Sequence, residues 1–122
     1  MSEYVVLLPG NETTWQATSQ EERAAVYARH IAFSEALAAR GHTVTGGAEL
    51  TLARAGKVVR RGPDGAAVVT DGPYAESAEQ LSGFYSVQSE DLDDLLQVCA
   101  ILAGADDGVE VRGTVDHSGG AA

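Results

Sequence analysis

Two helix-start signals, far apart in the chain and separated by strand patterns, constrain the fold of this sequence most. Ser19-Gln20-Glu21-Glu22 forms a capping box, in which the first hydroxyl and the last carboxylate satisfy backbone amides at a helix start. The predicted helix runs to about Arg40 and ends at Gly41, a residue suited to the left-handed turn that closes many helices. Asp91 caps a second predicted helix, whose apolar stripe comprises Leu92, Leu95, Leu96, Cys99 and Leu102.

The rest of the chain follows strand patterns. We predict strands at residues 4–8, 44–52, 53–61, 66–70, 81–88 and 109–112. Gly46-Gly47 predicts a bulge, and residues 62–65 predict the turn of a hairpin. In the segment 81–88 the predicted core face comprises Leu81, Gly83, Tyr85 and Val87. The order of these elements predicts an α+β domain, with an antiparallel sheet and both helices on one of its faces.

Composition limits the partners and the compartment. The 122 residues suit one domain, predicted over residues 1–115, with a flexible tail at 116–122. A net charge of -10 with only 8 Lys and Arg argues against binding to nucleic acid or to an anionic membrane. We expect a cytoplasmic protein, because the N-terminus lacks a signal-peptide pattern and the single Cys99, predicted to be a core residue, excludes an internal disulfide.

A rigid break follows the predicted strand at residues 66–70. Asp71-Gly72-Pro73 rarely continues a strand or a helix, so it ends the strand and aims the Asp71 side chain at a fixed point. In one interpretation Asp71 is structural and bonds the backbone of its own turn. In the other, its carboxylate serves a functional site.

The same segment carries a resemblance. Residues 70–76, Thr-Asp-Gly-Pro-Tyr-Ala-Glu, and 79–85, Glu-Gln-Leu-Ser-Gly-Phe-Tyr, resemble the signature of the YCII-related family in its DGPF-type branch, with Tyr74 where Phe is usual. The resemblance runs from about Tyr4 to Arg112. It implies a ferredoxin-like α+β fold and a homodimer of the dimeric α/β-barrel type, in which two sheets associate. The alternation of apolar residues on both faces of the segment 81–88 also favours a second copy on the open sheet face.

His30 is the candidate for acid–base chemistry. It lies on the apolar stripe of the first predicted helix with Val26, Phe33 and Leu37, and a histidine there is costly to leave unpaired. A carboxylate from Asp71 would orient the imidazole and raise its pKa above the usual value. The resemblance implies such a His–Asp pair, because family members carry a helix histidine and a His–Asp pair has been proposed as catalytic. The alternative is a core histidine bonded to a backbone carbonyl.

Four further residues are candidates for substrate binding, and a separate basic cluster could bind an anion. The candidates are Trp15, Arg23, Tyr74 and Tyr85, although aromatic residues often belong to a core or a dimer interface instead. The basic cluster comprises Arg54, Lys57, Arg60 and Arg61, which could hold an anion or form a charged hairpin edge. We expect no metal and no cofactor, because no spacing of His, Cys and Asp suits zinc and no glycine-rich phosphate loop opens a helix.

Two functions remain open. The first is a cofactor-independent enzyme acting on a small molecule by a lyase-type reaction, in which His30 is the base or acid and Asp71 orients it. A lone histidine suits proton abstraction better than hydrolysis, which requires a nucleophile or a metal in addition. The second is a non-catalytic module that binds a small molecule or has a regulatory role.

Overall fold

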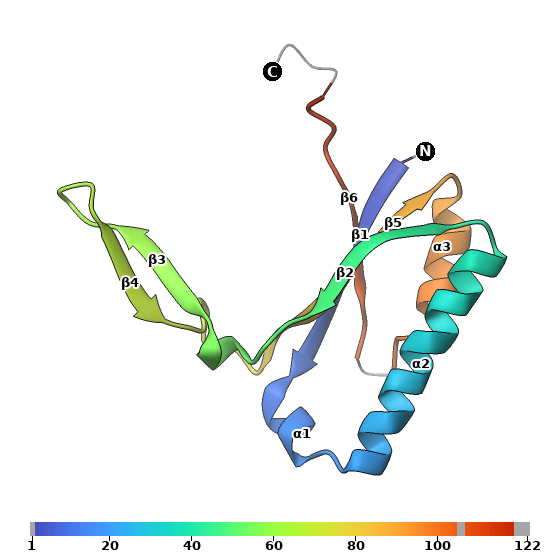
Figure 1. Cartoon of the computed structure of the whole chain (residues 1–122), viewed down its shortest axis with the longest axis horizontal. Helices are drawn as coiled ribbons and strands as arrows, with labels where there is room; N and C mark the ends of the chain where they lie inside the picture. Colours follow the sequence, from blue (N-terminus) through green and yellow to red (C-terminus); the bar gives the residue numbers. More distant parts are fainter. Residues whose placement is uncertain (1, 105–106, 119–122) are drawn as a thin grey trace.

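The computed structural model describes residues 2–104 and 107–118 (Figure 1). These residues form six strands, three α-helices and one short 3-10 turn. In chain order they are β1 Ser2–Asn11, α1 Glu12–Ala17, α2 Gln20–Ala39, β2 Thr43–Glu49, η1 Ala53–Ala55, β3 Lys57–Arg61, β4 Ala67–Asp71, β5 Glu79–Ser89, α3 Leu92–Cys99 and β6 Glu110–Gly113.

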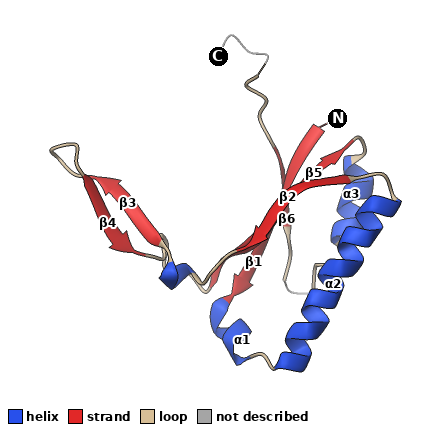
Figure 2. Cartoon of the chain, viewed as in Figure 1, coloured by secondary structure: helices blue, strands red, loops and turns tan. Residues whose placement is uncertain are grey.

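The central layer is a four-stranded antiparallel sheet in the order β2-β5-β1-β6. Helices α2 and α3 lie side by side against one face of this sheet (Figure 2). This is the predicted ferredoxin-like α+β arrangement, and the prediction is confirmed. The predicted bulge at Gly46-Gly47 is also present, since the register between β2 and β5 shifts between Val44 and Gly46.

One apolar core joins the two helices to the sheet. Its fully buried members come from β1, α2, β5 and α3, and they are Val6, Phe33, Leu37, Val87, Leu95, Val98 and Cys99. The predicted stripe of the second helix was partly wrong, because Leu92 and Leu96 are exposed while Val98 is buried. Helix α3 is only eight residues long, so it buries a single ridge of residues spaced three and four apart. Burial raises the pKa of the Cys99 thiol, as expected for a core residue rather than a nucleophile.

Both predicted helix caps form, but the second half of the capping box differs, because the Glu22 carboxylate accepts from the Ser19 hydroxyl and not from a backbone amide. The Ser19 hydroxyl accepts from the amide of Glu22 at 3.1 Å, and Asp91 likewise accepts from the amide of Asp94. Gly41 has a φ of 85°, the conformation expected just after a helix. Asn11 also caps the short helix α1, which the sequence analysis did not predict. Six residues are too few for helical periodicity to show in a sequence.

Strands β3 and β4 form the predicted hairpin, here called the arm (residues 57–71). They make a separate two-stranded sheet, which extends from the body on the side of the sheet away from α2 and α3 (Figure 1). The amide of Gly72 donates to the carbonyl of Gly56 at 2.8 Å and closes the base of the arm. The predicted strand over 53–61 is therefore shorter, because residues 53–55 form η1 instead.

In the predicted flexible tail, Asp116 accepts hydrogen bonds from Ser118, while residues 119–122 lie outside the described residues. None of the helices formed by residues 2–104 and 107–118 combines the length and the apolar character needed to cross a membrane.

Candidate functional site

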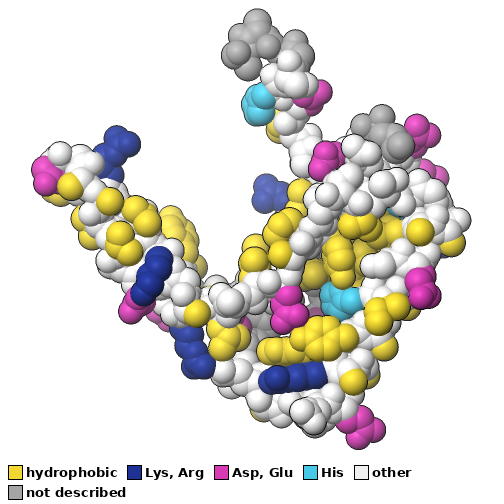
Figure 3. Space-filling view, viewed as in Figure 1, with side chains coloured by type: hydrophobic (Ala, Val, Ile, Leu, Met, Phe, Trp, Pro, Cys, Tyr) yellow, Lys and Arg dark blue, Asp and Glu magenta, His cyan; other side chains and the backbone are white. Residues whose placement is uncertain are grey.

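A large open cavity lies between one end of the sheet, helix α1 and the first half of helix α2. Its volume is about 1390 Å³, which is ample for a small molecule. Four of the predicted site residues line it, namely Trp15, Arg23, His30 and Tyr85. The space-filling view shows the hollow with apolar side chains on its wall and a histidine visible inside (Figure 3).

Helical and strand periodicity bring these residues to the cavity. Arg23, Tyr27 and His30 are spaced four and three apart on α2, so they share the face that looks toward the sheet. Tyr85 lies on β5 and points to the same side as the buried Val87. The Tyr85 ring packs against Phe33 with the two ring centres 5.1 Å apart, and this contact fixes the direction of its hydroxyl.

His30 and Tyr85 form a hydrogen-bonded pair at the cavity wall. The Nδ1 atom of His30 lies 2.7 Å from the Tyr85 hydroxyl oxygen. Because Nδ1 is engaged, Nε2 is the ring nitrogen that a ligand in the cavity would meet. Burial lowers the pKa of His30, the nearby Arg29 lowers it further, and Glu49 acts in the opposite direction. Burial also raises the pKa of Tyr85, so its hydroxyl keeps its proton at neutral pH.

A second group of contacts fastens α1 to α2 at the same cavity. The Nη2 atom of Arg23 donates to the carbonyl oxygen of Trp15 at 2.8 Å, and its guanidinium carbon lies 4.8 Å from the centre of the Trp15 ring. Tyr27 meets the same indole edge-on at 5.9 Å and donates to Glu49 at 3.2 Å. The Nε atom of Arg23 is buried and meets no acceptor within the described residues.

Asp71 and Tyr74 do not join this site within the chain. The Asp71 carboxylate lies 2.5 Å from the ammonium group of Lys57, on the arm. Tyr74 is 79% exposed and lies under the guanidinium group of Arg60. Neither residue lines the cavity, so the predicted contact of Asp71 with His30 is absent in this chain and Tyr85 takes its place. The expected rise in the pKa of His30 is accordingly replaced by a fall. The alternative interpretation, in which the Asp71 side chain bonds the backbone of its own turn, was also wrong, because the carboxylate pairs with Lys57 instead.

The basic cluster divides between two places. Lys57, Arg60 and Arg61 lie on the arm, while Arg54 lies on η1 at its base. All four are outside the cavity lining, which agrees with the interpretation of a charged hairpin rather than a substrate anchor. Lys57 pairs with Asp71 within the arm, and the Arg60 guanidinium group lies over the ring of Tyr74 at the base of the arm.

A polar cluster around His42 was missed by the sequence analysis. The His42 ring is buried, with Nδ1 2.8 Å from the hydroxyl of Ser89 and Nε2 2.7 Å from the carboxylate of Asp94. Arg40 pairs with the same carboxylate, and these contacts lower the pKa of Asp94. The hydrogen bonds link Ser89 to His42 and His42 to Asp94, as in the Ser–His–Asp triad of a hydrolase. Ser89, however, is 1% exposed, and its hydroxyl already bonds the backbone of Asp91. The cluster is therefore structural.

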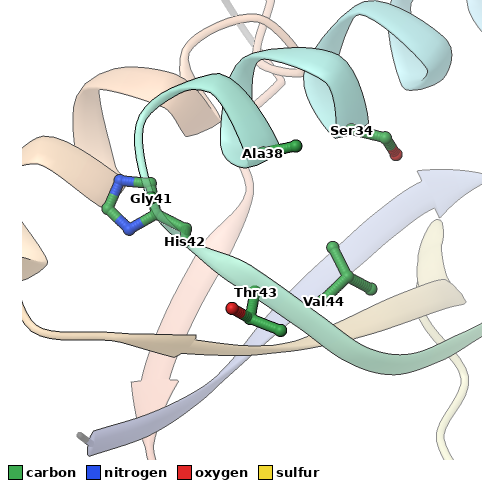
Figure 4. Close-up of a pocket in the computed structure, with 6 residues that line it drawn as sticks. All are labelled: Ser34, Ala38, Gly41, His42, Thr43 and Val44. Atoms are coloured by element: carbon green, nitrogen blue, oxygen red, sulfur yellow. The ribbon is translucent and has the colours of Figure 1, made fainter.

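A smaller hollow lies next to His42, between the end of α2 and the start of β2. Its volume is about 530 Å³, and the side chains of Ala38 and Val44 lie along it (Figure 4). Apart from the hydroxyl groups of Ser34 and Thr43 it offers a ligand mainly apolar contact, and it is smaller, so it is a weaker candidate than the cavity at His30. No cluster of three or more potential metal-ligating side chains occurs among residues 2–104 and 107–118.

The comparisons with known proteins agree with this fold. The model of a family described as the YCII-related domain matches residues 2–116, which is nearly the whole chain. The match does not distinguish branches of that family, so the DGPF-type assignment stays a prediction. No curated protein shows a significant match to the chain.

Proposed function

The chain belongs to the YCII-related family, and on that premise we propose that it is a cofactor-independent enzyme that moves a proton on a small molecule bound in the cavity at His30. The observation that carries this proposal is the hydrogen bond between His30 and Tyr85. It supplies an oriented imidazole at the wall of a cavity large enough for a substrate. The acid partner expected at Asp71 is thereby replaced by a phenol.

The hydrogen bond to Tyr85 decides how His30 acts as a base. When Nδ1 carries the proton and donates it to the Tyr85 oxygen, Nε2 has a free lone pair. Nε2 then takes a proton from the substrate, and the imidazolium that forms keeps its Nδ1–H bond to Tyr85. Return of the Nε2 proton to another substrate atom, or to a leaving group that departs with the bonding electrons, restores the neutral ring. An isomerisation or an elimination of the lyase type follows this scheme.

Electrostatics support the same assignment. The lowered pKa of His30 keeps the imidazole neutral at physiological pH, which is the state a general base requires. The raised pKa of Tyr85 keeps the phenol neutral, so it does not become a second charge beside the ring. Arg29, which influences His30 and lines the cavity, would stabilise negative charge that develops on the substrate.

The lining indicates the kind of substrate. Leu8, Trp15 and Val26 contribute apolar surface, whereas Arg23 and Arg29 contribute positive groups on α2. A small and largely apolar molecule with an acidic group, such as a phenol or a carboxylic acid, suits both features. The buried and unsatisfied Nε of Arg23 supports a role for this side chain in binding. Tyr74 would reach a ligand only from outside this cavity.

A ligand screen with two variants tests the proposal. Small phenols and carboxylic acids are tested by thermal shift against the wild type, because a binder raises the melting temperature. A binder is then incubated with wild type, His30→Gln and Tyr85→Phe, and its conversion is followed by NMR. We expect turnover by the wild type, binding without turnover by His30→Gln, and slower turnover by Tyr85→Phe.

Two outcomes would contradict the enzyme. A ligand that shifts the ring signals of His30 but is recovered unchanged from every variant would indicate the non-catalytic binding module instead. A ligand that leaves the His30 signals unchanged would place binding elsewhere. We further propose that the protein works in a reducing compartment such as the cytoplasm, because Cys99 is a free thiol in the core.

The open face of the sheet supports a homodimer. Leu7 and Phe84 are paired across β1 and β5, and both point away from the helices because their neighbours Val6 and Tyr85 point toward them. Each is only partly covered in the single chain. We propose that the sheet of a second copy covers this face, as the resemblance implied.

A further inference from the structure

The arm has an apolar surface that no other part of the described chain covers. Strands β3 and β4 pair with each other and not with the four-stranded sheet. The arm leaves the body on the side of the open sheet face, and the space-filling view shows a wide notch between the arm and the body (Figures 1 and 3). An isolated two-stranded hairpin is at best marginally stable in water, so this one requires packing from outside the chain.

Apolar side chains concentrate in the middle of the arm. Val59 and Val69 are directly opposite each other in the register, and they are 63% and 59% exposed. Val68 is exposed on the other face of the same hairpin. A pair of valines at adjacent positions is well suited to a β-sheet surface, but here the pair faces solvent. Exposed apolar surface on a strand pair of this kind marks an interaction site.

The charge of the arm indicates which partner covers it. The arm together with its base, residues 54–71, holds four basic residues, Arg54, Lys57, Arg60 and Arg61, against the acidic Asp64 and Asp71, so this longer segment has a net charge of +2. Since the whole chain carries -10, the remainder carries -12. The body of a second copy is therefore electrostatically complementary to the arm, whereas two bodies alone repel each other.

The apolar surface of the arm also continues toward the sheet. Tyr74 follows β4 at the base of the arm and Leu81 lies near the start of β5, and both side chains are exposed. A second copy seated on the open sheet face would thus meet the arm as well. A two-fold axis would let each copy receive the arm of the other in the same way.

We propose that the arm is a clasp. The arm of each protomer lies along the body of the other protomer, and these two contacts hold the dimer together. The contact between the two sheets forms one part of this interface. The two arms form the other part, in which the positive charge of each arm meets the negative charge of the other body. Within one chain the arm does not line the cavity at His30, so the clasp and the proposed chemistry rest on different residues and can be tested separately.

Sedimentation velocity on three proteins tests the clasp. The double variant Val59→Thr/Val69→Thr replaces the exposed apolar pair by polar residues of similar shape that retain a high strand propensity. The matched control is Val115→Thr, because Val115 is 76% exposed and lies outside the arm. We expect dimers for the wild type and the control, and a dissociation constant roughly tenfold or more higher for the double variant.

Hydrogen exchange on the wild type gives an independent readout that requires no variant. The amides of β3 and β4 should be protected at concentrations that favour the dimer and should exchange faster on dilution, in step with dissociation. A wild type that is monomeric throughout, a double variant as tightly associated as the control, or arm amides that exchange freely in the dimer would each overturn the clasp.

Discussion

The hydroxyl of Ser89 lies 2.8 Å from Nδ1 of His42 in the interior, and this contact joins the end of β5 to the entrance of β2. The opposite nitrogen of the same ring reaches Asp94 on α3, so one imidazole holds three elements together. Such a buried and fully bonded side chain contributes more to stability than an exposed one of the same type.

Replacing His42 by Ala should lower the free energy of unfolding by about 2–4 kcal/mol, because it removes two hydrogen bonds and leaves a cavity. Urea unfolding measures the change. His117→Ala is the control, since His117 is an exposed residue near the C-terminus, and it should leave stability unchanged. Equal stability of the two variants would contradict the structural role of the cluster.

Asp94 should make stability depend on pH in the acid range. Its pKa is lowered in the folded protein, first by the hydrogen bond from His42 and then by Arg40. The stabilisation is therefore complete above the ordinary value of about 3.9 and is lost as the pH falls through the lower folded pKa. Melting temperatures of the wild type and Asp94→Asn should differ by a constant amount above about pH 5 and should converge below about pH 4. A difference that does not vary with pH would contradict this.

His30 should titrate below the ordinary histidine value of about 6.5, because burial disfavours its charged form. The unfolded chain then binds more protons than the folded one between the two pKa values. Stability should accordingly rise with pH through this window, and below it the contribution of His30 should stay constant at its lower level. NMR of the imidazole ring protons gives the midpoint, and His30→Gln should remove the corresponding pH dependence of stability. A midpoint above 6.5 would instead indicate a nearby carboxylate, as first expected for Asp71.

Gly72→Ala should destabilise the protein by about 1–3 kcal/mol, through overpacking at the base of the arm. A Cβ at this position would collide with the backbone carbonyl of Ala53, which cannot move without shifting η1. Gly108→Ala is the matched control, because a Cβ there meets open space. Chemical denaturation of both variants compares them, and an equal midpoint would show that the base of the arm tolerates a side chain.

Arg23→Met should loosen α1 from α2, because it removes the bond to the Trp15 carbonyl and the cation from the indole face. The expected loss of stability is about 0.5–1 kcal/mol. Trp15 is the single tryptophan, so its fluorescence reports this contact directly, and we expect stronger quenching by acrylamide. Arg29→Met, which leaves the indole contact intact, should be quenched like the wild type. Equal quenching of all three proteins would mean that Arg23 does not hold the helix.

The predictable parts of the fold were those with a local cause. A capping box, a C-terminal glycine and residues spaced three and four apart act within one turn of helix, so the bounds of α2 and the burial of Phe33 and Leu37 could be read from the sequence. Likewise, His30 and Tyr85 were both expected on inward faces, and both line the cavity. Their mutual contact depends on the register of β5 against the rest of the sheet, which no local pattern encodes.

The Asp71-Gly72-Pro73 break shows a feature that could not be predicted from local sequence, namely the partner of the Asp71 side chain. Its rigidity was correctly linked to the end of a strand, but the target of Asp71 depends on where the whole hairpin lies. The hairpin leaves the body, so Asp71 meets Lys57 on the adjacent strand, and Gly72 packs against the backbone of η1. His42 was missed for a similar reason, because its partners Ser89 and Asp94 approach only when three elements have packed together.

The hydrogen bond between Gly56 and Gly72 has a consequence for how this protein can change over generations. The chain leaves the body at Gly56 and returns to it at Gly72, and the hydrogen bond between these two residues holds the ends of the hairpin together. Changes in the length or the charge of this segment leave the pairing of β2 with β5 intact. They also change the entropy of loop closure only slightly. If the arm carries the association proposed above, mutation can alter that association without touching the residues that line the cavity at His30, because the arm does not line this cavity.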